Sequence, residues 1–129
     1  MEKQITPSDL KIGNWLNYST EEGILPTKID WQDLAHLSEK PKDFNKYYSG
    51  IEITPEILVK CGFVKDEDED KYILTFIKGV EYIYKMENKC FYEYRFAFGE
   101  DFNLREIEYL HELQNLFYCL TGKELKIEL

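Results

Sequence analysis

The chain has 129 residues, close to the commonest size for a single domain, and we expect residues 1–129 to fold as one domain. It contains 25 acidic and 16 basic residues, which gives a formal net charge of −9. A surface with this charge repels phosphate backbones and disfavours free DNA or RNA as a direct ligand. It suits a basic protein partner or a nucleic-acid-binding groove on another protein, although net charge speaks first to solubility.

The cysteines and the N-terminus bear on the cellular compartment. Cys61, Cys90 and Cys119 are odd in number and far apart, and the sequence contains no CxxC pair. Free thiols of this kind favour a reducing compartment. The N-terminus lacks the apolar run of a signal peptide, and no stretch approaches the roughly 20 apolar residues of a membrane span. We therefore expect a cytoplasmic protein without membrane association.

The beginning of the chain predicts a β-hairpin. Residues 10–18 have the apolar alternation of a strand, with Asn14 as the break in the pattern. The pair at 22–23 is a turn signal, and residues 24–29 form the returning strand. Pro26 lacks a backbone N–H, so this second strand is expected at the edge of its sheet.

Two short helices are predicted next. Asp30 has the position of an N-cap for a helix over 31–38, and residues 39–50 read as a loop. The second helix, 55–61, has a threonine cap and proline at its first position, followed by Gly62 as the stop signal.

The middle of the chain predicts an antiparallel meander. Three runs, 72–77, 80–86 and 90–98, are rich in aromatic and β-branched residues and are separated by short polar connections. Gly99-Glu100-Asp101 is expected to end the meander. The last run alternates, and one face is expected to carry the following residues: Cys90, Tyr92, Tyr94, Phe96 and Phe98.

The last third predicts an amphipathic helix over 107–121, which Gly122 stops, and a short terminal strand over 125–129. Leucines and Phe117 recur at helical spacing, and the inward-packing set is expected to be Leu110, Leu113, Phe117 and Leu120. The predicted fold class is therefore α+β. It combines an antiparallel β-meander, an N-terminal β-hairpin, two short helices and a packed amphipathic helix near the C-terminus.

Three segments resemble a family of small, largely uncharacterised proteins of bacterial phages, prophages and related mobile elements. They are Leu-Lys-Ile-Gly-Asn-Trp at 10–15, Ile-Thr-Pro-Glu-Ile-Leu-Val-Lys-Cys-Gly-Phe at 53–63 and Tyr-Leu-His-Glu-Leu-Gln-Asn-Leu-Phe-Tyr-Cys-Leu-Thr-Gly-Lys-Glu-Leu at 109–125. The resemblance implies a phage or mobile-element protein in the cytoplasm of a bacterial host. It implies no activity and no catalytic residue.

The acidic run between the second helix and the meander is a candidate for contact with a basic partner. It consists of Asp66, Glu67, Asp68, Glu69 and Asp70. Alternate aspartates open some calcium loops, but such a loop needs glycine at its sixth position and glutamate at its twelfth. Those positions hold Lys71 and Ile77. The run is therefore expected to be a solvated turn, and the sequence predicts no metal site and no cofactor.

The last helix has a polar side that is a second candidate for partner binding. His111, Gln114, Asn115 and Tyr118 fall opposite the leucines. Polar residues in the middle of a helix must face water or find partners. The alternative is that Gln114 or Asn115 ties the helix to a neighbouring loop or strand end.

The cysteines predict no catalytic site, and the tryptophans predict no binding site. His111 and Cys119 lie about 12 Å apart along one helix, too far for a nucleophile and its base. Cys119 lies beside Leu116 and Leu120 and is expected to be a small core residue. Trp15 and Trp31 are expected in the core, although an exposed tryptophan often anchors an interface.

These observations favour a non-enzymatic, acidic protein-binding module, with no catalytic residues predicted. In the phage context, the concrete form is an inhibitor or modulator of a host nucleic-acid-handling system such as a defence nuclease, as anti-CRISPR proteins are. Two alternatives stay open: a minor structural or assembly accessory of the phage particle, and a small enzyme whose site is assembled from scattered carboxylates.

Overall fold

The computed structural model describes residues 4–129. Contacts between these residues divide the chain into two compact units. The first unit contains the residues up to Glu52, Tyr109–Leu125 and Leu129. The second contains Ile53–Glu108 and Lys126–Glu128. Both antiparallel sheets and helices are present, which confirms the α+β class. The expectation that residues 1–129 form one domain stays a prediction.

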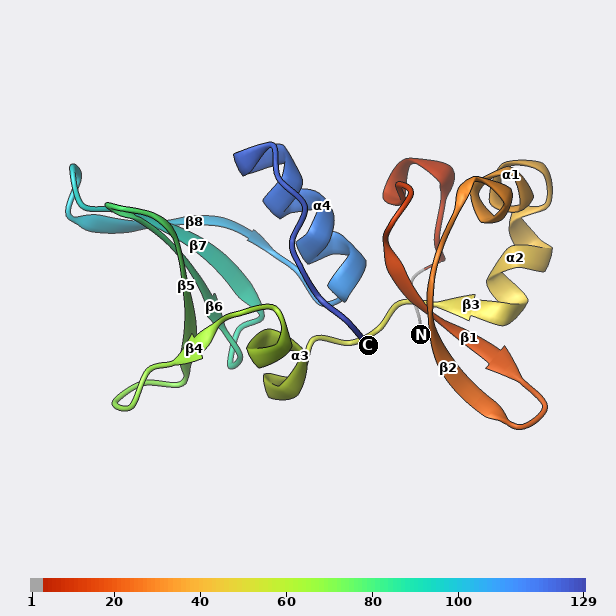
Figure 1. Ribbon diagram of the computed structural model, residues 1–129, viewed down its shortest axis with the longest axis horizontal. Helices are drawn as coiled ribbons and strands as arrows, with labels where there is room; N and C mark the ends of the chain where they lie inside the picture. Colours follow the sequence, from red (N-terminus) through yellow and green to blue (C-terminus); the bar gives the residue numbers. More distant parts are fainter. Residues whose placement is uncertain (1–3) are drawn as a thin grey trace. The chain divides into compact units, whose positions relative to one another are not determined.

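The first unit is built on a three-stranded antiparallel sheet in the order β2-β1-β3 (Figure 1). β1 is Trp15–Thr20, β2 is Gly23–Lys28 and β3 is Tyr48–Ser49. The predicted hairpin is confirmed, and its proline lies on the edge strand, where a missing N–H costs no ladder bond. β1 begins later than predicted because the chain turns at Gly13, whose φ of +96° suits glycine.

Helix α1, Trp31–Glu39, confirms the first predicted helix. The carboxylate of Asp30 accepts hydrogen bonds from the backbone N–H groups of the second and third helical residues, as an N-cap does. The loop predicted for 39–50 is wrong, because α2, Pro41–Tyr47, and β3 lie there. Helix α2 is too short to show a helical period in the sequence, and burial of Phe44 holds it in place.

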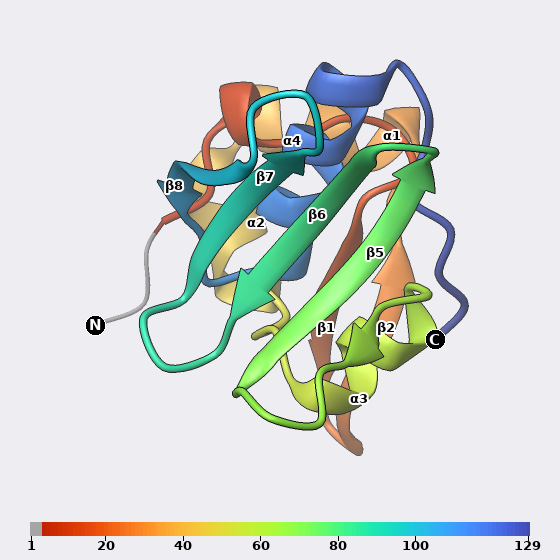
Figure 2. The same ribbon diagram turned by 90° about the vertical axis from the view of Figure 1, so that its left-hand side faces the viewer.

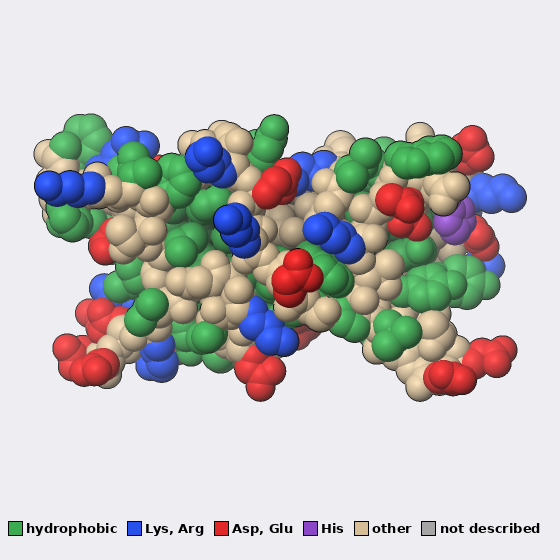
Figure 3. Space-filling model, in the orientation of Figure 1, with side chains coloured by type: hydrophobic (Ala, Val, Ile, Leu, Met, Phe, Trp, Pro, Cys, Tyr) green, Lys and Arg blue, Asp and Glu red, His purple; other side chains and the backbone are tan. Residues whose placement is uncertain are grey.

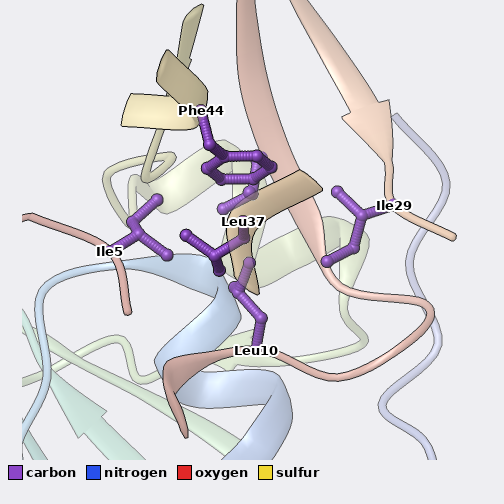
Figure 4. Packing of buried hydrophobic residues seen from close by; sticks show 6 residues of the cluster. Ile5, Leu10, Ile29, Leu37 and Phe44 are labelled. Atoms are coloured by element: carbon purple, nitrogen blue, oxygen red, sulfur yellow. The ribbon is translucent and has the colours of Figure 1, made fainter. Parts of the chain in front are cut away.

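One hydrophobic cluster forms the core of this unit (Figure 4). Its buried members come from the N-terminal segment, β1, the end of the hairpin and both helices: Ile5, Leu10, Leu16, Ile29, Leu37 and Phe44. The ring of Phe44 stacks on Tyr48 at a centroid distance of 4.2 Å. The hydroxyl of Tyr48 donates to Asp33, and burial together with this carboxylate raises the pKa of Tyr48.

Helix α4, Leu110–Thr121, also belongs to the first unit and is shorter than the predicted 107–121. The predicted stop is confirmed, since Gly122 has the left-handed φ of +72°. Two side chains expected in the core are exposed instead, Cys119 and Leu120, because the buried stripe narrows toward the end of the helix. The terminal strand predicted for 125–129 is absent from the described chain, where these residues form no ladder.

Close backbone approach fixes the entry to α4. A Cβ at position 50 would lie 2.6 Å from the ring of Tyr109, so only glycine fits there. Next to it, Glu52 and Tyr109 form an isolated antiparallel bridge, and Leu110 N–H donates to Ile51. This pairing keeps residues 107–109 extended, which explains why the helix starts late.

The second unit begins with helix α3, Pro55–Lys60. The Thr54 hydroxyl accepts a hydrogen bond from Ile57 N–H at 3.3 Å. After Gly62, whose φ is +97°, the N–H of Phe63 donates back to the Leu58 carbonyl. The cap, the helix and its stop are therefore as predicted.

The rest of this unit is a five-stranded antiparallel sheet in the order β4-β5-β6-β7-β8. The strands are β4 Val64–Lys65, β5 Lys71–Ile77, β6 Val80–Lys85, β7 Cys90–Arg95 and β8 Glu100–Glu106. Figure 2 shows β5, β6 and β7 side by side, with the short β4 beside β5. The predicted meander is confirmed, but it does not end at 99–101, because β8 adds one more strand.

β8 escaped prediction because its sequence lacks an apolar face. Four of its residues are charged, and nearly all of it is exposed at the edge of the sheet. β7 is shorter than predicted and ends at Arg95, so Phe96 and Phe98 lie in the following turn. Within β7 the fully buried side chain is Phe91, which stacks on Tyr82 from β6 at 5.5 Å.

Replacing Phe44 with alanine should lower the free energy of unfolding by about 3–5 kcal/mol, because the ring is fully buried and its removal leaves a cavity. Trp31→Ala is the matched control, since Trp31 is 66% exposed and its loss should cost less than about 1 kcal/mol. Urea denaturation of both variants measures the difference. Equal destabilisation would contradict this packing.

Stability should also fall at alkaline pH through Tyr82. Burial and a hydrogen bond to Glu93 raise the pKa of this tyrosine to about 12. Below pH 10, the ordinary pKa of tyrosine, the neutral Tyr82 side chain makes its full contribution to the free energy of unfolding. This contribution is lost as pH rises from 10 toward 12, because in that range the tyrosine ionises in the unfolded chain but not in the folded one. Urea titrations at several pH values should show wild type losing stability relative to Tyr82→Phe in that window. A pH-independent difference would refute the assignment.

Candidate partner-binding surfaces

The polar side of α4 turns out to be largely internal. Gln114 is 2% exposed, and its side-chain oxygen accepts a hydrogen bond from the backbone N–H of Trp15 at 2.9 Å. Its amide nitrogen donates to the carbonyl of Gly13 at 3.3 Å. The predicted alternative, that this residue ties the helix to a strand end, is therefore confirmed.

Two asparagines complete the same network. The amide nitrogen of Asn14, a fully buried side chain, donates to the side-chain oxygen of Asn115 at 2.9 Å. Asn115 in turn donates to the carbonyl of Asp9 at 2.8 Å. The Asn14 oxygen accepts from the N–H of Lys11, which closes the turn before β1. The break that Asn14 makes in the apolar pattern marks this network.

The other two candidates on α4 differ from each other. His111 is 5% exposed and stacks on Tyr109 at 5.8 Å, so it lies inside the unit. Tyr118 is 44% exposed, and the ammonium of Lys11 sits 4.9 Å from its ring centroid. Lys11 also forms an ion pair with Glu124. Of the four predicted residues, only Tyr118 presents a large exposed area to a partner.

The acidic run forms a tight turn between β4 and β5, as predicted. The carboxylate of Asp66 accepts the backbone N–H groups of Asp68 and Glu69, and these bonds lower its pKa. Glu69 pairs with Lys71 at 3.1 Å, and the rest of the run is exposed. Within residues 4–129, no cluster of three or more histidine, cysteine or acidic side chains is arranged to hold a metal ion.

At one end of the five-stranded sheet a group of apolar side chains is exposed, here called the aromatic end: Ile77 from β5, Phe96 and Phe98 from the turn after β7, and Phe102 from β8. Their exposed fractions are 56%, 62%, 65% and 39%. The N–H of Phe96 donates to the carbonyl of Gly79 at 3.0 Å and joins this turn to the one between β5 and β6. Phe98 and Phe102 pack edge to face at 5.7 Å. Several neighbouring apolar residues exposed together are a common mark of an interaction site.

Sequence reasoning missed the aromatic end because it extended β7 through residue 98. An available signal was the segment Phe96-Ala97-Phe98-Gly99, since glycine favours a turn and two aromatic residues then flank its tip. The glycine has a φ of +68°, which fits this reading.

A second exposed feature is the groove between α1 and the start of α2, here called the α1–α2 groove. It is a shallow, open hollow of about 370 Å³, lined by Trp31, Ala35, His36, Glu39, Lys40 and Asp43, among others. His36 Nε2 lies 2.8 Å from Asp43 Oδ2. The expectation that Trp31 is in the core is wrong, while Trp15, at 8% exposed, is buried as expected. Trp31 lies about 120° around α1 from the buried Leu37.

Comparison with known proteins adds no family or fold relative: no protein-family model, no curated protein and no solved structure matches the chain. The structure thus defines an α+β protein, and the resemblance to phage and mobile-element proteins stays a prediction. Within residues 4–129, no helix is both long enough and apolar enough to cross a bilayer.

Replacing Gln114 with alanine should lower the free energy of unfolding by about 1–3 kcal/mol, because the buried N–H of Trp15 then loses its acceptor. Cys119→Ala on the same helix is the control. Its side chain is exposed, so its loss should change stability by no more than about 0.5 kcal/mol. Thermal and urea unfolding would measure both. A Gln114→Ala variant as stable as the control would show that the bond contributes nothing.

Proposed function

We propose that this chain is a protein-binding module without catalytic activity, of phage or mobile-element type. In the cytoplasm of a bacterial host it would inhibit or modulate a nucleic-acid-handling system such as a defence nuclease. The observation that carries the proposal is the aromatic end, where Phe96 and Phe98 are more than half exposed on a turn. Exposed aromatic side chains supply large contact area and dominate the binding energy of many interfaces.

The charges near the aromatic end are compatible with a protein interface. Arg95 pairs with Glu93 at 2.8 Å beside the turn, while Glu100 and Asp101 begin β8 on its other side. Apolar side chains bordered by charged residues reproduce the core and rim of a protein interface. A partner with a basic border around an apolar pocket fits this arrangement.

The acidity of the chain supports a basic partner through local contacts. In Figure 3 acidic and basic side chains are interspersed on the face in view, so no single-sign patch covers it. The strongest local concentration is the acidic turn at 66–70, at the opposite end of β5 from Ile77. Seven residues of strand separate these two ends by about 23 Å. A partner that contacts both must extend along the whole sheet.

The surroundings of the cysteine and histidine side chains support a binding function rather than a catalytic one. In the second unit the thiol of Cys61 has a pKa raised to about 12 by burial, which suppresses its thiolate. In the first unit His36 and Asp43 form a pair, and the groove residues beside them include no serine or cysteine that could act as a nucleophile. These features support a module that acts by occupying another protein.

The test is affinity capture from host lysate with the tagged chain, followed by mass spectrometry. Wild type should enrich a specific host protein relative to the tag alone. The double variant Phe96→Ser, Phe98→Ser should lose it, because serine removes the anchoring rings without disturbing buried residues. Ile24→Ser is the matched control, since this side chain is 63% exposed on β2, which belongs to the other unit.

Two outcomes would contradict the proposal. Failure of wild type to enrich any host protein would remove the support for a host partner. Equal capture by wild type and by the double variant would show that the aromatic end is not the binding surface.

A further inference from the structure

We propose that the α1–α2 groove binds a short basic segment of a partner protein, with an arginine side chain stacked on Trp31. This goes beyond the proposed function because it assigns a separate site and the chemistry of its ligand. The groove combines an exposed indole at one end with two carboxylates at the other.

The shape follows from residue spacing along α1. Trp31, Ala35 and Glu39 are four residues apart and therefore lie along one side of the helix, each about 6 Å from the next. All three line the groove. The small side chain of Ala35 leaves room between the two larger ones. The groove is shallow and open to solvent, which suits an extended segment laid across it rather than an enclosed small molecule.

The indole at one end is the natural contact for a cation. Trp31 is 66% exposed, so its ring packs little against the core and is accessible to a ligand. Tryptophan is the best aromatic partner for a cation above its face. Arginine suits such a ring better than lysine does, because its planar guanidinium stacks and is less strongly hydrated.

Carboxylates mark the other end. Glu39 is at the end of α1, and Asp43 faces the groove from α2, where it is held by His36. Lys40 is the opposing charge in the lining and offsets one of the two carboxylates, so that one negative charge is in excess.

The distance between the two ends sets the length of the ligand. Eight residues of helix separate Trp31 from Glu39 by about 12 Å, more than one arginine side chain can span. A ligand that uses both ends therefore has at least two cationic residues. Such segments are common on proteins that bind nucleic acids, and the net charge of −9 attracts them over longer range.

The probe is a synthetic tetra-arginine peptide with both ends blocked, titrated into the ¹⁵N-labelled full chain. The indole N–H signal of Trp31 should shift as the groove fills. Trp15 is buried and serves as an internal reference whose signal should stay in place. Tetra-lysine should bind more weakly by about two- to fivefold, and tetra-glutamate should not bind.

Three variants locate the site. Trp31→Ala should weaken tetra-arginine binding by about two- to fivefold or more, and Glu39→Gln should weaken it and reduce its dependence on salt. The matched control replaces the acidic turn 66–70 with asparagine and glutamine. It removes five charges that do not line the groove and should leave the Trp31 shift intact at physiological salt, where exposed charges that do not contact the ligand are screened.

The proposal is overturned if the Trp31 signal does not move at millimolar peptide, or if Trp31→Ala binds as tightly as wild type. It is also overturned if the acidic-turn variant loses binding while Trp31→Ala keeps it, because the turn would then be the basic-peptide site. Circular dichroism confirms that each variant is folded. None of these results depends on the aromatic end, so they are distinct from the lysate capture that tests the proposed function.

Discussion

The arrangement of the first unit depends on the buried hydrogen bonds between α4 and the segment that precedes β1. Gln114 and Asn14 are a hundred residues apart in the chain, and both are almost completely buried. A buried amide that lacks partners is costly, so the two segments satisfy these groups only when they lie together in one register. The network therefore specifies where α4 docks, which its apolar stripe alone leaves open because leucines pack in several ways.

One edge of each sheet is protected against uncontrolled strand pairing. On β2 the edge carries Pro26, which removes one backbone donor. On β8 the register slips between the partners of Phe91 and Tyr92, so that Leu104 is the extra residue of a bulge. The strand is also highly charged. Such edges discourage strand addition, so side chains are the more natural means of contact with a partner.

The two exposed surfaces are located where the chain turns rather than where it is most regular. Phe96 and Phe98 flank a turn of the sheet, and Trp31 is the first residue of α1. In both places the backbone is fixed by local hydrogen bonds, while the side chains are left outside the core. Rigid placement of large rings lowers the entropy lost on binding, which suits both surfaces to recognition.

By itself the sequence determined the α+β class, the hairpin with its edge proline, both capped helices, the meander and the acidic turn. Each depends on local rules: turn residues, caps and apolar periodicity. The sequence could not determine burial where tertiary packing decides it. Gln114 proved to be internal, whereas Trp31 and Cys119 proved to be exposed.

Only the tertiary structure decided where the candidate surfaces are. The aromatic end needs residues of β5, of β8 and of the turn after β7 at the same end of one sheet, which follows from strand order and register rather than from any of these segments alone. The α1–α2 groove is lined by residues of two helices, with Glu39 on α1 and Asp43 on α2, and α2 was not predicted from the sequence. Contacts between segments that are far apart in the sequence leave no periodic pattern in either segment. For this physical reason the sequence alone could not reveal them.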